Sequence, residues 1–220
     1  MKQLIIFCFI LLAAIPLKAG FVIGYQGGIY TPPMANTQST MYYYNKVFQA
    51  NFNYNNFFKG IFIGVRLDED KGWISMAWNK KQNVFTSEYI TPANERYKLS
   101  IKTRMNELVL DGGVKYKGWG LGGGFNLANL NVLTKRGKVE EFGAAKWANE
   151  YGAPIKILGL PNYPSFSIIG ERHFSKFVIM RMTYHFGIGD VTFSNDGSLT
   201  FYDFKPKNLT LALLFNLGKF

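Results

Sequence analysis

The sequence has few of the residues that build disulfides, metal sites and catalytic centres. Its 220 residues include one cysteine, Cys8, and two histidines, His173 and His185. A lone thiol cannot form an intramolecular disulfide, and a metal site needs several convergent ligands, for which we see no spacing here. After residue 20, no apolar run is long enough for a membrane-spanning helix. We therefore expect no metal, no cofactor and no catalytic residues.

Acidic residues are also scarce. There are 14 of them against 25 lysines and arginines, which gives a formal charge of +11 at pH 7. The basic residues are scattered, mostly over segments that we interpret as loops and turns, whereas a nucleic-acid-binding protein concentrates them on one face or helix. We therefore expect no nucleic-acid partner. Basic loops that face anionic lipid head groups or polysaccharide are a more natural use of this charge.

The first 19 residues are typical of a secretory signal peptide. Lys2 is followed by an apolar run from Leu4 to Pro16, and Ala19 precedes Gly20. A basic start, a short apolar core and a small residue before the cut are the features of such a peptide. We predict cleavage after Ala19, so that residues 20–220 form one mature domain without a thiol. An uncleaved membrane anchor is the alternative.

Period-two alternation of apolar residues recurs along the rest of the chain. Aromatic residues make up 17% of the sequence, so disorder is not expected. The opposite faces of the alternating segments carry glycine and polar or charged side chains. Alternation predicts strands, but it does not decide which face meets solvent. Eight segments show it, near residues 21–29, 61–67, 74–78, 108–116, 119–127, 166–174, 178–186 and 209–217.

The connections between these segments alternate strictly between long and short. Short periplasmic turns at one end and long external loops at the other are typical of outer-membrane barrels. Two long connections contain aromatic segments, 41–48 and 139–150, for which we consider short helices or extended hairpins. The short turns lie at 68–72, 117–118 and 175–176, and the long connections span about 31–56, 81–98, 131–163 and 189–207.

Aromatic residues gather at both ends of the predicted strands. Amphipathic rings at both ends match the two interfacial girdles of a transmembrane barrel. The alternative is a soluble periplasmic binding barrel whose aromatic residues fill its core. Near the short turns lie Trp73, Trp119, Phe174, Phe177 and Phe220, and toward the long connections lie Tyr30, Trp78 and residues 184–186.

These features predict an all-β fold, an eight-stranded antiparallel transmembrane β-barrel with short periplasmic turns and long external loops, in a Gram-negative outer membrane. The pattern over residues 20–220 resembles the small outer-membrane barrels, such as the OmpA transmembrane domain and OmpX, and more closely the outer-membrane β-barrel proteins of Bacteroidota. The alternating leucines of 209–215 and the final Phe220 resemble the signal that the barrel assembly machinery recognises. Phe220 is out of phase with the odd-numbered apolar set, which a bulge or a short tail would explain.

The predicted inner face carries six charged residues. An eight-stranded barrel is just wide enough for side chains to fill, and unpaired buried charge is costly. Three acids and three bases therefore predict a plugged lumen with an ion-pair network. The glycines at 120, 122 and 124 are expected to leave room beside the long basic side chains. A narrow gated conduit is the alternative. The six residues are Arg66, Glu107, Asp111, Lys115, Glu171 and Arg181.

One short motif is compatible with enzymatic activity. His173-Phe174-Ser175 has the His-x-Ser spacing of the outer-membrane lipid A deacylases, in which a histidine and an acid activate the serine, and Glu171 is nearby. The motif falls at a predicted periplasmic turn, away from the outer leaflet, and Lys176 replaces the asparagine of the family motif. We therefore expect a non-enzymatic protein, surrounded by lipid and lipopolysaccharide, that acts through its loops in surface interaction or envelope integrity. A lipid A-modifying hydrolase is the alternative.

Overall fold

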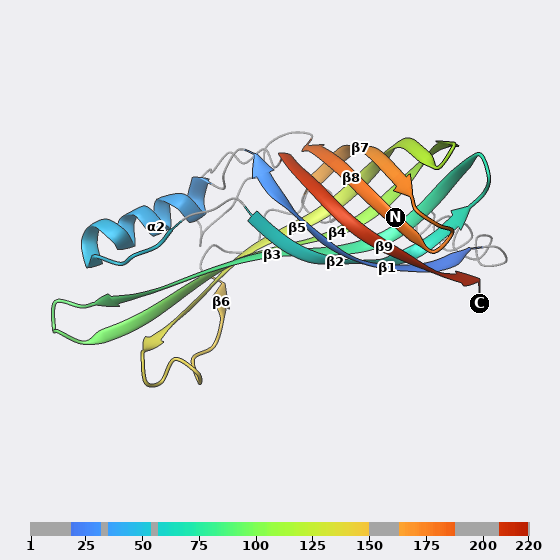
Figure 1. Ribbon diagram of the computed structural model, residues 1–220. Helices are drawn as coiled ribbons and strands as arrows, with labels where there is room; N and C mark the ends of the chain where they lie inside the picture. The colour runs from blue at the N-terminus through green and yellow to red at the C-terminus, as the bar shows by residue number, and fades with distance from the viewer. Residues whose placement is uncertain (1–18, 32–34, 54–56, 150–162, 188–206, 220) are drawn as a thin grey trace, which may run out of the picture.

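A computed structural model gives the arrangement of the chain in space (Figure 1). It describes residues 19–31, 35–53, 57–149, 163–187 and 207–219. The predicted signal peptide, apart from its last residue, lies outside these ranges, as do Phe220 and most of the predicted loop 189–207.

Eight strands form a ring-like antiparallel sheet in which each strand pairs with two neighbours. They are β1 (Gly20–Thr31), β2 (Phe57–Asp68), β3 (Gly72–Ile90), β4 (Arg96–Tyr116), β5 (Trp119–Lys138), β7 (Tyr163–His173), β8 (Val178–Gly187) and β9 (Lys207–Lys219). Around the ring the order is β4-β3-β2-β1-β9-β8-β7-β5, and the pairing of β4 with β5 closes it. The prediction of an all-β fold with eight antiparallel strands is confirmed.

Alternation in the sequence decides which side chains face out of the ring and which face in. In β9 the side chains of Leu211 and Leu213 are exposed, whereas those of Thr210 and Leu214 are almost completely buried. The same period of two runs through β8, where buried and exposed positions alternate strictly over most of the strand. Because successive side chains of a strand point to opposite faces, the apolar stripes found in the sequence lie on the outer surface of the ring.

The three short turns lie where the sequence predicts them. β2 ends at Asp68 and β3 begins at Gly72, and residues 174–177 join β7 to β8. Lys117 and Gly118 alone connect β4 to β5, with φ angles of 47° and 78°. Two consecutive left-handed residues are typical of the tight turn whose twist matches a β-hairpin.

A bulge near the end of β9 explains why the last residues are out of step with the alternation of apolar residues in that strand. Gly20 pairs with Lys219, but Val22 pairs with Asn216, so β9 holds one extra residue there. Gly218 has a φ of 88°, and its N–H donates to Oδ1 of Asn216 at 3.1 Å. A glycine in the left-handed region is a common way to build such a bulge. Of the two explanations offered for the phase, the described residues support the bulge.

β3, β4 and β5 extend beyond the ring and form an arm (Figure 1). They have 19, 21 and 20 residues, against 10 to 13 for the other five strands of the ring. β2 pairs with β3 only as far as Gln82, whereas β3 and β4 stay paired up to Ile90 and Arg96. The prediction of a long loop over 81–98 is therefore wrong. The next two outward positions of β3 after Trp78 are Lys80 and Gln82, so apolar alternation is interrupted there although strand pairing continues.

Helix α2 (Ala35–Phe48) packs against the arm on the face that continues the inner surface of the ring. This helix includes the aromatic segment 41–48, for which a helix was one of two predictions. Within the described ranges, no helix has both the length and the hydropathy that crossing a membrane requires. The apolar cluster between helix and arm contains Met41, Ala50, Phe52, Phe85, Tyr89, Leu99 and Ile101.

The segment 139–149 is not helical. Residues 139–144 form turns, and β6 (Ala148–Asn149) pairs with Leu133 and Thr134 of β5. Phe142 and Trp147 lie against lysine side chains of the arm, with Lys102 Nζ 3.8 Å from the ring centre of Trp147. The spacing of the aromatic residues suggested a helix. In the structure these residues contact the neighbouring sheet.

Trp73 lies inside the ring, although we predicted it in an outward aromatic girdle. Its side chain is 3% exposed. A Cβ atom built at Gly120 or at Gly122 would be only 2.8 Å from the indole. These two glycines therefore make room for tryptophan, and the prediction that they make room for long basic side chains is wrong. Period-two alternation points to the same conclusion, because the neighbouring Ile74 faces outward.

The close approach at Gly122 predicts that a single methyl group is costly there. An alanine Cβ would lie 2.8 Å from Trp73 and 2.9 Å from Cα of Gly113. We expect Gly122→Ala to lower the free energy of unfolding by about 1–3 kcal/mol. Gly170→Ala is the matched control, since no atom lies within 4 Å of its added Cβ. Urea titration followed by tryptophan fluorescence measures both, and equal stability of the two variants would contradict this packing.

Candidate functional site

The charged side chains predicted for the inner face lie inside the ring, apart from one at its rim. Lys115 is at the end with the short turns, where its side chain is 15% exposed. The other five come from β2, β4 and the β7–β8 hairpin, and the ring closure brings these three parts of the chain together. At most 6% of each of these five residues is exposed: Arg66, Glu107, Asp111, Glu171 and Arg181.

Four of these residues form what we call the central ion-pair cluster: Arg66, Asp111, Glu171 and Arg181. The guanidinium group of Arg66 donates two hydrogen bonds to the carboxylate of Glu171, at 2.9 and 2.8 Å. Arg181 lies between both acids, with Nε 2.7 Å from Glu171 Oε1 and one terminal nitrogen 2.7 Å from Asp111 Oδ2. Two positive and two negative charges therefore balance, which offsets the cost of removing them from water.

Uncharged neighbours complete the bonding of Asp111. Its Oδ1 accepts hydrogen bonds from Nε1 of Trp73 at 2.9 Å and from Oγ of Ser75 at 2.6 Å. The guanidinium of Arg66 also lies 4.9 Å from the ring centre of Trp73, within the range of a cation–π contact. Trp73 therefore has two polar roles in addition to its packing. Neither role was predicted from the sequence, because Trp73 was expected on the outer surface.

A second ion pair lies nearer the arm. Lys81 Nζ is 2.8 Å from Oε2 of Glu107, and it donates to Oδ1 of Asn208 at 3.1 Å. It is also 3.4 Å from Nε2 of His185, and Asn79 donates to Glu107 at 3.3 Å. Lys81, the partner of Glu107, was not predicted from the sequence, because residue 81 was expected in a loop. Extending the alternation of β3 by two residues from Asn79 would have found it.

Uncharged side chains also fill the interior of the ring. An apolar cluster of Val22, Phe62, Ala77, Ile179, Ala212 and Leu214 occupies part of it. A cavity of about 10 Å³ lies next to Asn79, Asp111 and His185. Such a cavity has room for about one water molecule.

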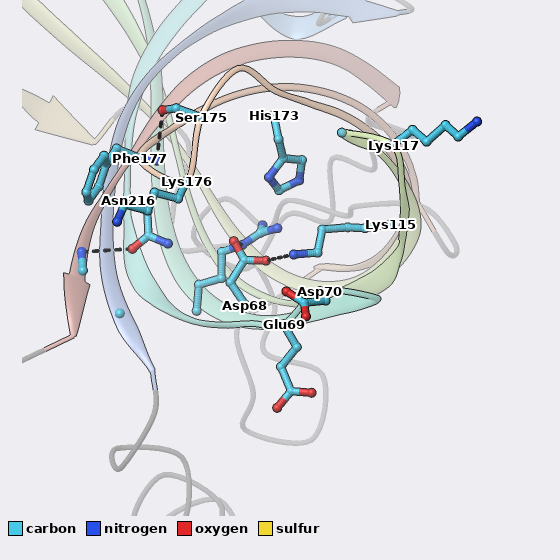
Figure 2. A pocket seen from close by; sticks show the side chains of 14 residues that line it. Asp68, Glu69, Asp70, Lys115, Lys117, His173, Ser175, Lys176, Phe177 and Asn216 are labelled. Atoms are coloured by element: carbon cyan, nitrogen blue, oxygen red, sulfur yellow. Dashed lines mark hydrogen bonds and ion pairs between the residues drawn. The ribbon is translucent and has the colours of Figure 1, made fainter.

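The ring opens into a pocket at the end with the short turns (Figure 2). The pocket has a volume of about 560 Å³, and charges of both signs line it. Lys115 Nζ is 2.7 Å from Oδ1 of Asp68, so its partner is a rim residue and not a member of the central cluster. Asp68 was not among the predicted residues, because the sequence placed it in the turn 68–72, whereas it is the last residue of β2.

His173 and Ser175 of the His-x-Ser motif have different partners at this rim. The imidazole of His173 points toward the middle of the opening, and its Nε2 is 3.1 Å from Oε2 of Glu171. The Oγ of Ser175 accepts hydrogen bonds from the N–H groups of Phe177 and Val178, each at 3.1 Å. Ser175 thus stabilises its own turn, and Glu171 is already bonded to the two arginines of the central cluster.

Among the described residues, no group of three or more His, Cys, Asp or Glu side chains is arranged to hold a metal ion. Comparison with known proteins adds no family: no family model matches the chain, and no curated protein matches it significantly.

The central ion-pair cluster predicts a large difference between two arginine substitutions. Arg181→Met leaves the buried carboxylate of Asp111 without its arginine, and we expect a loss of about 3–5 kcal/mol in the free energy of unfolding. Arg96→Met is the control. Arg96 makes a 2.8 Å ion pair with Glu88, but its side chain is 69% exposed, so we expect a loss below about 1 kcal/mol. Urea titration of both purified variants checks this, and similar losses would show that burial does not set the cost.

Proposed function

We propose that the chain is an integral outer-membrane barrel with a plugged polar lumen. In this proposal it is non-enzymatic, and its long loops and arm act in surface interaction or envelope integrity. Residues 1–19 are its signal peptide, lipid and lipopolysaccharide surround it, and the barrel assembly machinery inserts it. The observation that carries the proposal is the inversion of polarity across the sheet, with apolar side chains outside and paired charges inside.

The outer surface supports this orientation. Soluble proteins rarely expose a continuous apolar surface of this kind, whereas a barrel in lipid requires one. Strands of 10 to 13 residues, the length of the five shorter strands in the ring, can cross a bilayer when tilted. We define the apolar belt by exposed outward side chains on neighbouring strands: Ile74, Trp78, Leu108, Leu110, Leu121, Phe166, Ile168, Met182, Leu209, Leu211 and Leu213.

Aromatic side chains at both edges of the belt add support. Trp119, Phe174 and Phe177 are exposed near the short turns, and Trp78 and Tyr184 are exposed toward the arm and the long connections. Aromatic rings at two levels match the interfacial girdles of a membrane barrel. A soluble binding barrel would keep such rings, and its apolar stripes, in the interior.

The closed edges of the sheet fit a lipid environment. In hydrocarbon every backbone N–H and C=O group needs a partner within the protein, and a ring of paired strands supplies one. The pairing of β4 with β5 and of β1 with β9 leaves no strand of the ring with an unpaired side along the belt.

A membrane insertion assay tests the proposal. Folded barrels resist detergent, so the membrane-extracted mature chain is expected to migrate differently on a gel before and after boiling. Leu211→Lys places a charge in the belt and should lower the folded fraction, because a lysine near the bilayer centre costs about 2–4 kcal/mol. Val47→Lys on α2 is the control, since the two side chains are similarly exposed, at 54% and 52%.

Three results would contradict the membrane orientation. The first is a chain that fractionates without detergent, and the second is an extracted chain that shows no shift on boiling. The third is an equal effect of Leu211→Lys and Val47→Lys, because a protein surrounded by water tolerates a lysine at either position.

The filled interior predicts a protein that conducts poorly. With the central ion-pair cluster across the lumen and a cavity of about 10 Å³ beside it, the described part of the ring leaves hydrated ions no continuous path. Planar bilayers that contain the folded wild-type chain are expected to show conductance at the level of empty bilayers. Steady single-channel steps would contradict the plugged lumen and favour the narrow conduit.

A further inference from the structure

The outer face of the arm carries a cluster of positive charges directly beyond the apolar belt. We call Lys80, Lys102, Arg104 and Lys135 the basic cluster. They lie on three neighbouring strands, with Lys80 on β3, Lys102 and Arg104 on β4, and Lys135 on β5.

Strand register places all four on one face. Arg104 is opposite Gln82 and Lys102 is opposite Val84, both on the outward set of β3 that includes Lys80. Lys135 is opposite Ser100, which lies two residues from Lys102 on β4. Side chains that are directly or diagonally opposite on one face of a sheet are within interaction range. The four charges therefore form one patch.

The patch lacks acidic partners among the residues that the structure describes. The ion pairs of the arm belong to other side chains, namely Glu88 with Arg96 and Lys98, and Glu95 with Lys138. Burial and then the positive charges of the other three cluster residues lower the pKa of the Lys102 ammonium group. The electrostatic potential at the basic cluster is therefore positive.

One buried polar atom of the basic cluster, Nε of Arg104, also lacks a hydrogen-bond partner among the described residues. A buried N–H group without an acceptor is unfavourable, so an external acceptor would improve its environment. The ammonium groups of Lys102 and Lys135 lie over the rings of Trp147 and Phe142, and Lys135 Nζ also donates to the carbonyl oxygen of Gly143 at 3.2 Å. None of these contacts supplies a carboxylate.

The position of the cluster relative to the belt identifies the ligand chemistry. Lys80 is two residues beyond the exposed Trp78 on the same face of β3, which is about 7 Å along the strand. In the proposed membrane orientation, that step leads from hydrocarbon to head groups. Lysine and arginine side chains at this level attract anionic lipids, and phosphate is a preferred acceptor for both.

We infer that the basic cluster binds the phosphate groups of a membrane lipid whose acyl chains lie against the apolar belt. The ligand is a phosphorylated lipid of the leaflet on the side of the arm, with lipid A as the representative probe. This inference rests on the proposed membrane orientation. The proposed function places the barrel among lipids in general, and this inference adds a specific binding site for one class of lipid.

Lipid binding to the folded mature chain in neutral detergent tests the inference. Native mass spectrometry measures the concentration of lipid A at half saturation for the wild type and for Lys102→Gln/Arg104→Gln. We expect at least a tenfold weaker binding for the variant, since each of the two basic residues contributes on the order of a fivefold effect near an anionic lipid surface. Lipid A from which the phosphates have been removed should bind the two proteins equally.

A control with the same loss of charge separates a site from general attraction. Lys71→Gln/Lys117→Gln removes two exposed charges at the short turns, on the opposite side of the belt. This variant should bind lipid A like the wild type. The shift in gel migration on boiling is recorded for every variant, so that loss of binding is counted only for chains that are folded.

Each failure has a distinct meaning. Equal lipid A affinity for the wild type and for Lys102→Gln/Arg104→Gln, in chains that still shift on boiling, overturns the site but leaves the membrane orientation intact. Equal weakening by the control variant overturns it too, in favour of non-specific attraction. If inorganic phosphate at millimolar concentration displaces lipid A completely, the acyl chains contribute nothing and a lipid site is also overturned. Absence of the gel shift in the wild type contradicts the proposed function itself.

Discussion

The bonds between two arginines and two carboxylates at the centre of the ring are the interaction on which the rest of the structure depends. Arg66, Asp111, Glu171 and Arg181 come from β2, β4, β7 and β8, so the cluster connects strands around the whole ring. A slip of one residue in any of these strands would turn its charge toward the outer surface. The cluster thus selects one register for four strands, and its pairing makes a polar interior compatible with an apolar exterior.

Much of this arrangement could be predicted from alternation alone. The period of two identifies eight strands and the residues that share each face, among them five of the six charges that the ring buries. Short gaps between the alternating segments locate the short turns, and Gly118 is suited to the left-handed conformation that its turn needs. What alternation cannot supply is a list of partners. Whether Glu171 meets Arg66 or Lys115 depends on strand register and ring curvature, which are properties of the closed sheet.

The errors have specific physical causes. Residues 81–98 were predicted as a loop because apolar alternation ends at Trp78, yet backbone hydrogen bonds continue to Ile90 without it. Lys81 was therefore missed as the partner of Glu107. Trp73 was assigned by its distance from a turn, although its parity placed it inside. In both cases the strand alternation continued through the residue. The prediction was wrong because it followed the usual location of a residue type, polar residues in loops and tryptophan in an outer girdle, and not the alternation.

The pairing of β1 with β9 has a consequence for the order in which the fold can form. These strands are the first and last of the ring, and Ile29 pairs with Leu209 across almost the whole chain. Hairpins such as β3–β4 or β7–β8 need only local contacts, whereas the pairing of β1 with β9 closes the longest loop in the ring and is expected to form last. Until then two sheet edges with unpaired backbone groups stay open, and open edges promote association with other chains. Protection of the half-built sheet is therefore a requirement of this topology, whatever the sequence of its loops.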